Sequence, residues 1–397
     1  MSTPPSPPTA NGRSKRYTLL AVLAIVFLSA GAAYGAYWTM VGRYWENTDD
    51  AYVGGNQVAI TPRIAGTVIA VHVDDTDRVK AGETLVKLDD SDTQLALRQA
   101  EAQLAETVRR IHQAFETVKQ DDANVARKRV ALRQAGYDLN RRYHLIGEKA
   151  ISRETLAHAW GTARSAQADL RLALARLAAA RALVAGTTVA DHPAVRQAEA
   201  QVREAYLALS RCHIVSPVNG YIAKRSVQVG QRVAPGAPLM AVVPLNQLWV
   251  KVNLKEDKLA HVRIGQPVTL TSDIYGGGVV FHGKVEGLSP GTGGAFALLP
   301  PQNASGNWIK IIQRLPVRVS LNTHELERYP LRIGLSMRAK IDTHDRSGPV
   351  LAAATPTQPR YATTVYVANP AAVEARIQRI VNANNPPLTP AGESSAP

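Results

Sequence analysis

An internal repeat, split by a long helical segment, limits the folds open to this chain more than any other sequence feature. The first copy is residues 61–89, TPRIAGTVIAVHVDDTDRVKAGETLVKLD, and the second is residues 216–244, SPVNGYIAKRSVQVGQRVAPGAPLMAVVP. Matched residues keep their character at a constant offset of 154, and the pairs are Gly66 with Gly220, Val68 with Ile222, Val73 with Val227, Val79 with Val233, Gly82 with Gly236, Leu85 with Leu239 and Leu88 with Val242. Alternating apolar and polar residues predict short strands in each copy. Because a lone hairpin is marginal in water, we expect both copies to form one β domain.

The end of the first copy, GETLVKLDDSDTQ, is similar to half of a lipoyl or biotinyl carrier domain. In such carriers a lysine that bears the swinging arm follows the acidic pair, whereas here Asp92 holds that position. We therefore predict a lipoyl-like domain with no cofactor, built from residues 58–90 and 213–244. Its turn glycines are Gly66, Gly82, Gly220 and Gly236. Of these, Gly82 and Gly236 lie where a turn needs positive φ or close backbone approach.

The segment between the two halves, residues 91–212, is predicted to be an antiparallel coiled-coil hairpin. Apolar residues recur three, four and seven apart, first along an outgoing arm to about Leu145 and then along a returning arm. Ser91 is the expected N-cap of the first helix, Ser152 caps the second, and Asp191 with Pro193 restarts a helix after an interruption. At about 1.5 Å per residue the rod is roughly 80 Å long. Both of its ends enter the same β domain, which fixes its direction.

The N-terminal region predicts a membrane anchor. Residues 17–38 contain no charged side chain and are long enough to span a bilayer. The basic residues before this run place residues 1–16 in the cytoplasm and the rest of the chain outside it. A cleaved signal peptide is the alternative, but its apolar run is usually shorter, about 7–15 residues. We therefore expect a single uncleaved span in the inner membrane.

Composition argues against several other classes of protein. The formal net charge is +14, but Lys and Arg are spread along the whole chain without an aromatic-rich basic patch, which argues against nucleic-acid binding. The single cysteine, Cys212, permits no intrachain disulfide and is expected to be a buried, inert thiol. The histidines show no metal-binding spacing, so we expect no metal site. Asp92 argues against a carried cofactor, and no residue of the long helical segment suggests catalysis, so we also expect no cofactor and no catalytic residues.

Residues 245–345 alternate as strands separated by glycine-rich turns, which predicts an antiparallel β-barrel domain. Residues 47–57 are expected to add a strand to it. Inside this region, SPGTGGAFALLPPQNASGNW is an apolar, glycine-rich loop, and we expect its side chains Phe296, Leu298 and Leu299 to contact another protein chain. The alternative is that these three side chains plug the barrel.

The C-terminal part, residues 346–384, is predicted to hold one last strand and a short helix. Val373, Ile377, Ile380 and Val381 share one face of that helix, which would pack on the barrel or lie at the membrane surface. Residues 385–397 are rich in proline and are predicted to be a disordered tail.

The whole pattern resembles the periplasmic adaptors, or membrane fusion proteins, of the HlyD family, and most closely the EmrA type. The stretches that carry the resemblance include NTDDAYVGGNQV, LMAVVPLNQLWVKVNLKE and GTGGAFALLPPQNASGNWIKIIQRLPVRV. The resemblance as a whole covers about residues 15–345. The resemblance implies an α+β fold with a transmembrane helix, a hairpin in a split lipoyl-like domain and a β-barrel. It also implies multidrug efflux with an EmrB-like major facilitator exporter and a TolC-like outer-membrane channel. The apolar loop with Phe296, Leu298 and Leu299 would then contact the exporter or a neighbouring protomer. The adaptor itself would be a homo-oligomer, a hexamer or a trimer.

One motif of this family matches residue by residue. Adaptors that dock on such channels carry Arg-x3-Leu-x6-Ser at the hairpin tip, and RRYHLIGEKAIS places Arg141, Leu145 and Ser152 in that spacing at the predicted turn. The alternative is structural: Arg141 is solvated, Leu145 closes the hairpin core and Ser152 only caps a helix.

Three functions remain open at this level. The favoured one is an efflux adaptor, which is not an enzyme. The second is an adaptor of an ABC-driven type I secretion system, which a neighbouring ATPase gene would favour. The third is a lipoyl or biotinyl carrier subunit, against which Asp92 argues.

Overall fold

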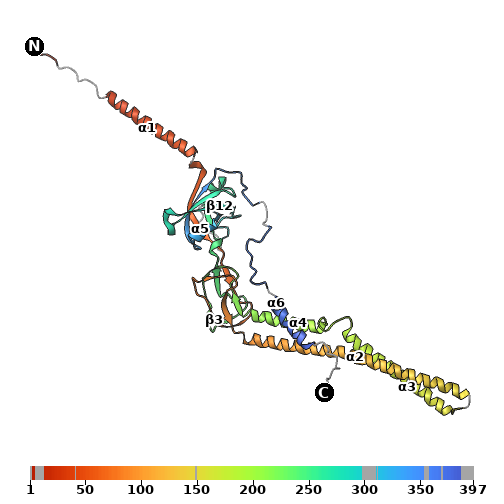
Figure 1. The fold of residues 1–397 in the computed structure, drawn as a ribbon. Coiled ribbons are helices and arrows are strands. Elements are labelled where there is room, and N and C mark those ends of the chain that lie inside the picture. The colour runs from red at the N-terminus through yellow and green to blue at the C-terminus, as the bar shows by residue number, and fades with distance from the viewer. Residues whose placement is uncertain are drawn as a thin grey trace, which may run out of the picture.

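The computed structural model describes residues 2–4, 13–40, 42–147, 150–296, 310, 312–352, 357–367 and 370–385. The protein is elongated, and its parts follow one another along its length (Figure 1). An N-terminal helix leads into a β-barrel, the barrel into a smaller β domain, and that domain into a long helical hairpin. Each β domain is built from chain on both sides of the hairpin, so the domains are nested as the sequence predicts.

Helix α1, Arg13–Met40, stands apart from the rest of the protein. In the described part of the chain, one helical stretch, Arg16–Tyr44, is long and apolar enough to cross a membrane, and α1 forms most of it. The most apolar part of this stretch is not buried against the rest of the protein. The turn η1, Gly42–Tyr44, then joins it to the barrel. There the Thr343 amide donates to the Tyr44 carbonyl at 2.8 Å, which ties the helix end to the barrel wall.

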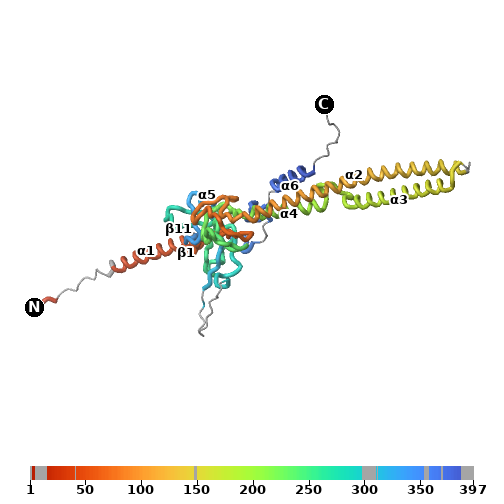
Figure 2. The backbone as a smooth tube through the Cα atoms, turned by 90° about the horizontal axis from the view of Figure 1, so that it is seen from below, coloured from red at the N-terminus to blue at the C-terminus, as the bar shows by residue number. Residues whose placement is uncertain are grey.

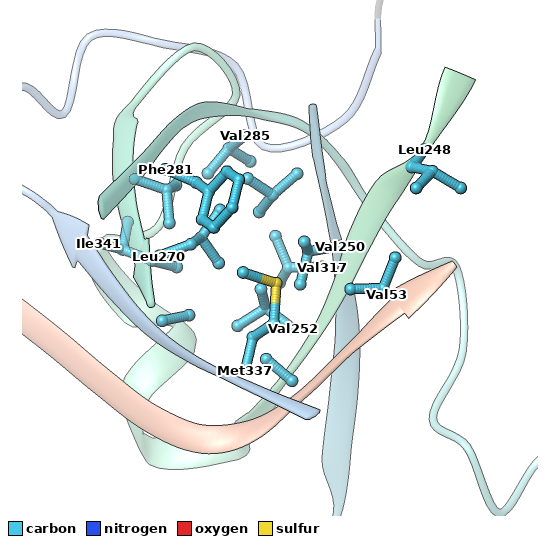
Figure 3. Packing of buried hydrophobic residues seen from close by; sticks show 14 of the residues in the cluster. Val53, Leu248, Val250, Val252, Leu270, Phe281, Val285, Val317, Met337 and Ile341 are labelled. Atoms are coloured by element: carbon cyan, nitrogen blue, oxygen red, sulfur yellow. The ribbon is translucent and has the colours of Figure 1, made fainter. Parts of the chain in front are cut away.

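The barrel has six antiparallel strands and is closed, in the order β1-β10-β13-β12-β11-β14. The strands are β1 (Trp45–Gly54), β10 (Trp249–Lys255), β11 (Pro267–Ser272), β12 (Val280–Leu288), β13 (Arg314–Leu321) and β14 (Ser336–Asp342). The short helices are η2 (Leu245–Gln247), η3 (Glu256–His261), η4 (Asp273–Gly278) and α5 (Thr323–Arg328). Alternate side chains point inward, and Phe281, Leu270 and Met337 fill the centre (Figure 3). Closure pairs β1 with both β10 and β14, so the strand expected from the N-terminal side completes the wall.

The lipoyl-like domain consists of two four-stranded sheets, and each sheet takes two strands from each half of the domain, residues 58–90 and 213–244. Their orders are β2-β9-β7-β4 and β6-β5-β3-β8. The strands are β2 (Val58–Ile60), β3 (Gly66–Val71), β4 (Arg78–Val79), β5 (Thr84–Leu88), β6 (His213–Val215), β7 (Gly220–Ala223), β8 (Arg232–Val233) and β9 (Met240–Val243). One core unites them, in which repeat-equivalent residues such as Leu85 and Leu239 are both buried. Within each copy two strands pair directly, β3 with β5 and β7 with β9, and strands of the other half complete each sheet. Because a two-stranded pair alone is marginal in water, each copy needs the other.

The hairpin pairs one continuous helix with two shorter ones. Helix α2, Ser91–Gly147, runs outward, and α3 (Arg153–Val184) and α4 (Pro193–Ser210) return beside it (Figure 2). The distal half, α2 with α3, has a thin core of Val125, Ala173 and Leu177. Between α3 and α4 the Ala194 amide donates to Nδ1 of His192 at 3.2 Å. His192, rather than Asp191, is therefore the N-cap of α4.

The C-terminal helix α6, Pro370–Asn384, packs on the hairpin. The expectation that it packs on the barrel or lies at the membrane surface is wrong, because its apolar face is buried against α2 and α4. The expected strand in residues 346–384 is also wrong for the residues described there, which contain helix α6 and irregular backbone. At the start of α2, Ser91 does not cap, since its hydroxyl donates to Asp89 at 2.7 Å and the helix already begins at Ser91.

Candidate functional site

The hairpin tip brings the three motif residues to the two sides of one turn. Arg141 and Leu145 lie in the last two turns of α2, and Ser152 immediately precedes α3. Ser152 Oγ accepts a hydrogen bond from the Thr155 amide at 3.1 Å, so the prediction that Ser152 caps the returning helix is confirmed. The Ala150 amide donates to the Leu145 carbonyl at 3.1 Å, which closes the end of α2.

Charge and exposure make Arg141 available at this tip. Its side chain is 72% exposed, and its Nη2 donates to Asp138 Oδ1 at 2.7 Å. Arg142 Nε contacts the other oxygen of the same carboxylate at 2.9 Å. Two guanidinium groups thus share one carboxylate, and the tip keeps a net positive charge. Leu145 is half-buried and therefore offers apolar surface only in part.

A groove beside the tip contains residues that the motif did not include. It has a volume of about 810 Å³ between α2 and α3, and its lining includes Leu139, Tyr143, Ile146, Leu156 and Trp160. Tyr143 is 65% exposed and Trp160 55% exposed. In the sequence, these two large aromatic residues lie outside the apolar seam of an alanine-rich hairpin. Because aromatic side chains are enriched at protein interfaces, that position is a signal for a binding surface.

The barrel loop is described only in part. Phe296 is 69% exposed, so this side chain does not plug the barrel. Its ring lies against Gly291, where a Cβ would come within 2.7 Å of the ring. Leu298 and Leu299 lie outside the described residues. The described part of the loop therefore presents an exposed aromatic side chain, Phe296, after β12, and the contact expected of the loop stays a prediction.

The four repeat glycines act in pairs. Gly82 and Gly236 have φ of 86° and 82°, the left-handed conformation expected at those turns. A Cβ at Gly220 would lie 2.6 Å from the Val243 carbonyl oxygen, and one at Gly66 would lie 3.2 Å from Leu88 Cδ1. The first pair shapes turns, and the second pair permits close packing between strands.

The position that bears a lysine in carrier domains belongs to a helix. Asp92 is exposed in the first turn of α2, so the position that bears the modified lysine in carrier domains is here part of the base of the hairpin. Nearby, Cys212 is buried, its sulfur lies 3.3 Å from Thr93 Oγ1, and burial raises the pKa of the thiol. Among the residues that the structure describes, no group of three His, Cys, Asp or Glu side chains is placed to hold a metal ion.

Both roots of the hairpin leave from adjacent strands of one sheet. Helix α2 begins three residues after β5, and α4 ends three residues before β6. Strands β5 and β6 pair directly, with Thr84 opposite Val215 and Lys87 opposite His213. Because neighbouring strands lie about 4.8 Å apart, the two arms start side by side and point the same way.

A single apolar helix, a barrel, a split lipoyl-like domain and a hairpin together define a membrane fusion protein. Comparison with known proteins agrees: residues 91–212 match the family described as the EmrA alpha-helical hairpin domain. The multidrug export protein EmrA of Escherichia coli K12 is 48% identical over 352 residues, which are 89% of this chain and 90% of that protein. The probable multidrug resistance protein EmrK of the same strain is 46% identical, covering 94% and 97% of the two chains.

A solved structure of the periplasmic adaptor protein EmrA is 19% identical, with a TM-score of 0.39 over 76% of this chain and 99% of that one. From the sequence identities, the chain belongs to the EmrA family of multidrug efflux membrane fusion proteins. The apolar helix α1 fits a protein anchored in the inner membrane.

Proposed function

We propose that this protein is the periplasmic adaptor of a tripartite multidrug efflux pump. It connects an EmrB-like, proton-driven major facilitator exporter in the inner membrane to a TolC-like channel in the outer membrane. It is held by one membrane span, it has no catalytic role, and the rest of the chain lies in the periplasm. The observation that carries the proposal is the hairpin with both roots on paired strands, since such a rod is suited to bridging and has no obvious use in a carrier subunit.

The reach of the rod supports this role. Helix α2 has 57 residues, which at about 1.5 Å per residue gives a rod of about 85 Å. The rod and α1 extend from opposite ends of the β domains (Figure 1). A single rod encloses nothing, so the working form is a ring of copies, six or three, whose rods surround a conduit.

The tip residues supply the proposed contact with the channel. Arg141 is an exposed multidentate donor suited to carboxylates and backbone carbonyls. Leu145 adds apolar surface beside it, and Ser152 fixes the start of the returning helix. At the other end, Phe296, with Leu298 and Leu299, is proposed to contact the exporter or the next protomer.

Two experiments test this function. The first is purification from membranes after mild crosslinking, followed by identification of the proteins that accompany the adaptor. A many-span permease and an outer-membrane channel are expected, an ATPase would favour type I secretion, and a covalent cofactor on the intact mass would indicate a carrier subunit.

The second experiment is the substitution Arg141→Asp, compared with Arg129→Asp at an exposed position about 18 Å back along α2. We expect Arg141→Asp to abolish export at unchanged membrane abundance, because a carboxylate at the tip repels carboxylates and offers no donors. Arg129→Asp should retain export. Full drug resistance in the Arg141→Asp strain would remove the docking role from this residue.

A further inference from the structure

The C-terminal helix turns the base of the hairpin into a three-helix bundle. Helix α6 lies against α2 and α4, and Ile377, at its centre, is 0% exposed. From the hairpin, Val108 on α2 and Val202 on α4 are also 0% exposed in the same core. The base core is therefore shared among three helices, whereas the distal half of the rod has two.

Charged side chains fasten both edges of α6. Arg203 on α4 makes a bidentate contact with Glu374, in which Nε donates to Oε1 at 2.7 Å and Nη2 donates to Oε2 at 3.0 Å. The same Nη2 also donates to Oε2 of Glu199 at 3.1 Å. The hydrogen bond from Arg203 lowers the pKa of the Glu374 carboxyl. On the other edge, Arg376 pairs with Glu101 of α2. Such paired contacts fix the position of the helix along the rod as well as its contact face.

The chain that leads to α6 is attached to the barrel first. Gln266 Nε2 donates to the Asp345 carbonyl at 2.7 Å, and the Ile264 amide donates to the Pro349 carbonyl at 3.0 Å. Gly348 passes so close to the barrel that a Cβ there would lie 2.3 Å from the Ile264 carbonyl oxygen. The first residues after β14 thus run along the barrel wall.

The same chain next contacts the lipoyl-like domain. Thr363 Oγ1 donates to the Pro217 carbonyl at 2.7 Å, and the guanidinium of Arg63 lies over the ring of Tyr366 at 5.4 Å. Burial raises the pKa of the Tyr366 hydroxyl. The described residues of this segment, 343–352, 357–367 and 370–385, are called here the strap, and they contact the barrel, the lipoyl-like domain and the hairpin in turn.

The joint that the strap crosses is narrow. Within the described chain, the barrel and the lipoyl-like domain are joined by the connection from Gly54 to Val58 and the one from Val243 to Trp249, apart from the strap. The buried cores of the two domains are separate, so a joint made of two short connections is free to bend. The strap is a third link, because its described residues are hydrogen-bonded to both domains, and it opposes that bending.

We propose that the strap holds the hairpin in a fixed direction relative to the barrel, with Arg203, Glu374 and Ile377 as positioning residues. The benefit of this arrangement rests on the proposed function, since an adaptor must present its tip to a channel while its barrel faces the inner membrane. The mechanical claim itself concerns the isolated protein.

The test is a distance distribution measured on the full-length protein in detergent. Spin labels are placed at Lys284→Cys in the barrel and Gln99→Cys at the hairpin root, both exposed, in a Cys212→Ala background. Dipolar spectroscopy then compares four backgrounds: unchanged, Ile377→Asp, Arg203→Glu, and Arg203→Glu with Glu374→Arg. Arg379→Glu on the exposed face of α6 is the matched control.

In the unchanged protein we expect a narrow distribution of distances between the two spin labels. This distribution should broaden in Ile377→Asp, and also in Arg203→Glu, because the latter change brings three carboxylates together. It should narrow again in the charge-swapped double variant and stay narrow in the control. Amide exchange in α6 should rise roughly tenfold in Arg203→Glu and return in the double variant.

The charge swap keeps the test valid if Ile377→Asp does not fold. An unchanged distribution in Arg203→Glu overturns the proposal, whether or not α6 exchanges faster. Because no exporter or channel is present, this result is independent of the efflux assignment. Export assays of the same variants in cells then show whether the direction of the rod matters for the pump.

Discussion

Truncating one buried leucine in either repeat copy should destabilise both copies equally. Leu85 is 0% exposed and its counterpart Leu239 is 2% exposed, in one core that draws on both sheets. Replacing a fully buried leucine by alanine costs about 2–5 kcal/mol, through lost burial and the cavity that remains. Since 1.4 kcal/mol is a factor of ten, even the lower figure corresponds to about 30-fold more frequent opening of the domain.

Amide hydrogen exchange followed by mass spectrometry measures this opening segment by segment. In Leu85→Ala, exchange should accelerate by the same factor in β5 of the first copy and in β7 and β9 of the second, because a cooperative unit opens as a whole. Leu239→Ala should give the same pattern. Ile69→Ala, on β3 but 45% exposed, is the matched control and should change exchange little.

Exchange that accelerates only within residues 58–90 in Leu85→Ala would refute this prediction. That outcome would mean that the two copies are separately stable. The hairpin roots would then lack a common base, and the direction of the rod would no longer follow from the sheet that carries it.

The remaining predictions concern single positions. Gly220→Ala should lower stability by about 1–3 kcal/mol in chemical unfolding, because its Cβ would meet the Val243 carbonyl oxygen, whereas Gly161→Ala, in open space on α3, should not. Ser152→Ala should cost about 1 kcal/mol and increase amide exchange at the start of α3, while Ser152→Asp should retain the cap. Cys212, whose pKa is raised by burial, should resist alkylation at about pH 8 until the protein unfolds. The stability conferred by this neutral thiol should be lost as the pH rises through its raised folded-state pKa, measured by unfolding at increasing alkaline pH.

Local and repetitive patterns made most of the fold predictable. The constant offset between repeat copies fixed the strand positions and indicated that distant segments share a core, as cluster residues such as Val79 and Val233 show. The break between α3 and α4 at residues 185–192 was indicated by glycine and proline residues there. Ser152 was recognisable as an N-cap because it directly precedes a segment with helical spacing of apolar residues. These signals lie within a few residues of the features that they specify.

Contacts between distant, non-repeated segments were not predictable. The apolar face of α6 was visible in the sequence, but no residue near Val373 or Ile377 indicates which element that face packs against. On α2, the packing of the hairpin helices against each other was sufficient to explain the apolar stripe that includes Leu104 and Val108. In the structure that stripe is shared with α6. An apolar stripe reports that a face is buried and does not report which element buries it.

Local sequence signals were wrong at one helix cap and incomplete at the hairpin tip. Ser91 has the residue type and spacing of an N-cap, yet Asp89 accepts its hydroxyl and its amide, and the helix begins one residue earlier than expected. At the tip, a family motif named three residues, whereas the exposed aromatics Tyr143 and Trp160 belong to no motif. The groove that they share forms only where α2 and α3 lie side by side.

The most direct test of the bridging role is site-specific photocrosslinking in living cells. A photoreactive amino acid is placed at Leu145 in one strain, at Arg129 in a second and at Phe296 in a third, and the adducts are identified by mass spectrometry. We predict an outer-membrane channel protein attached at Leu145 but not at Arg129, and an inner-membrane exporter or a second adaptor copy attached at Phe296. Absence of any outer-membrane protein at Leu145, in cells that still export drugs, would contradict the bridge.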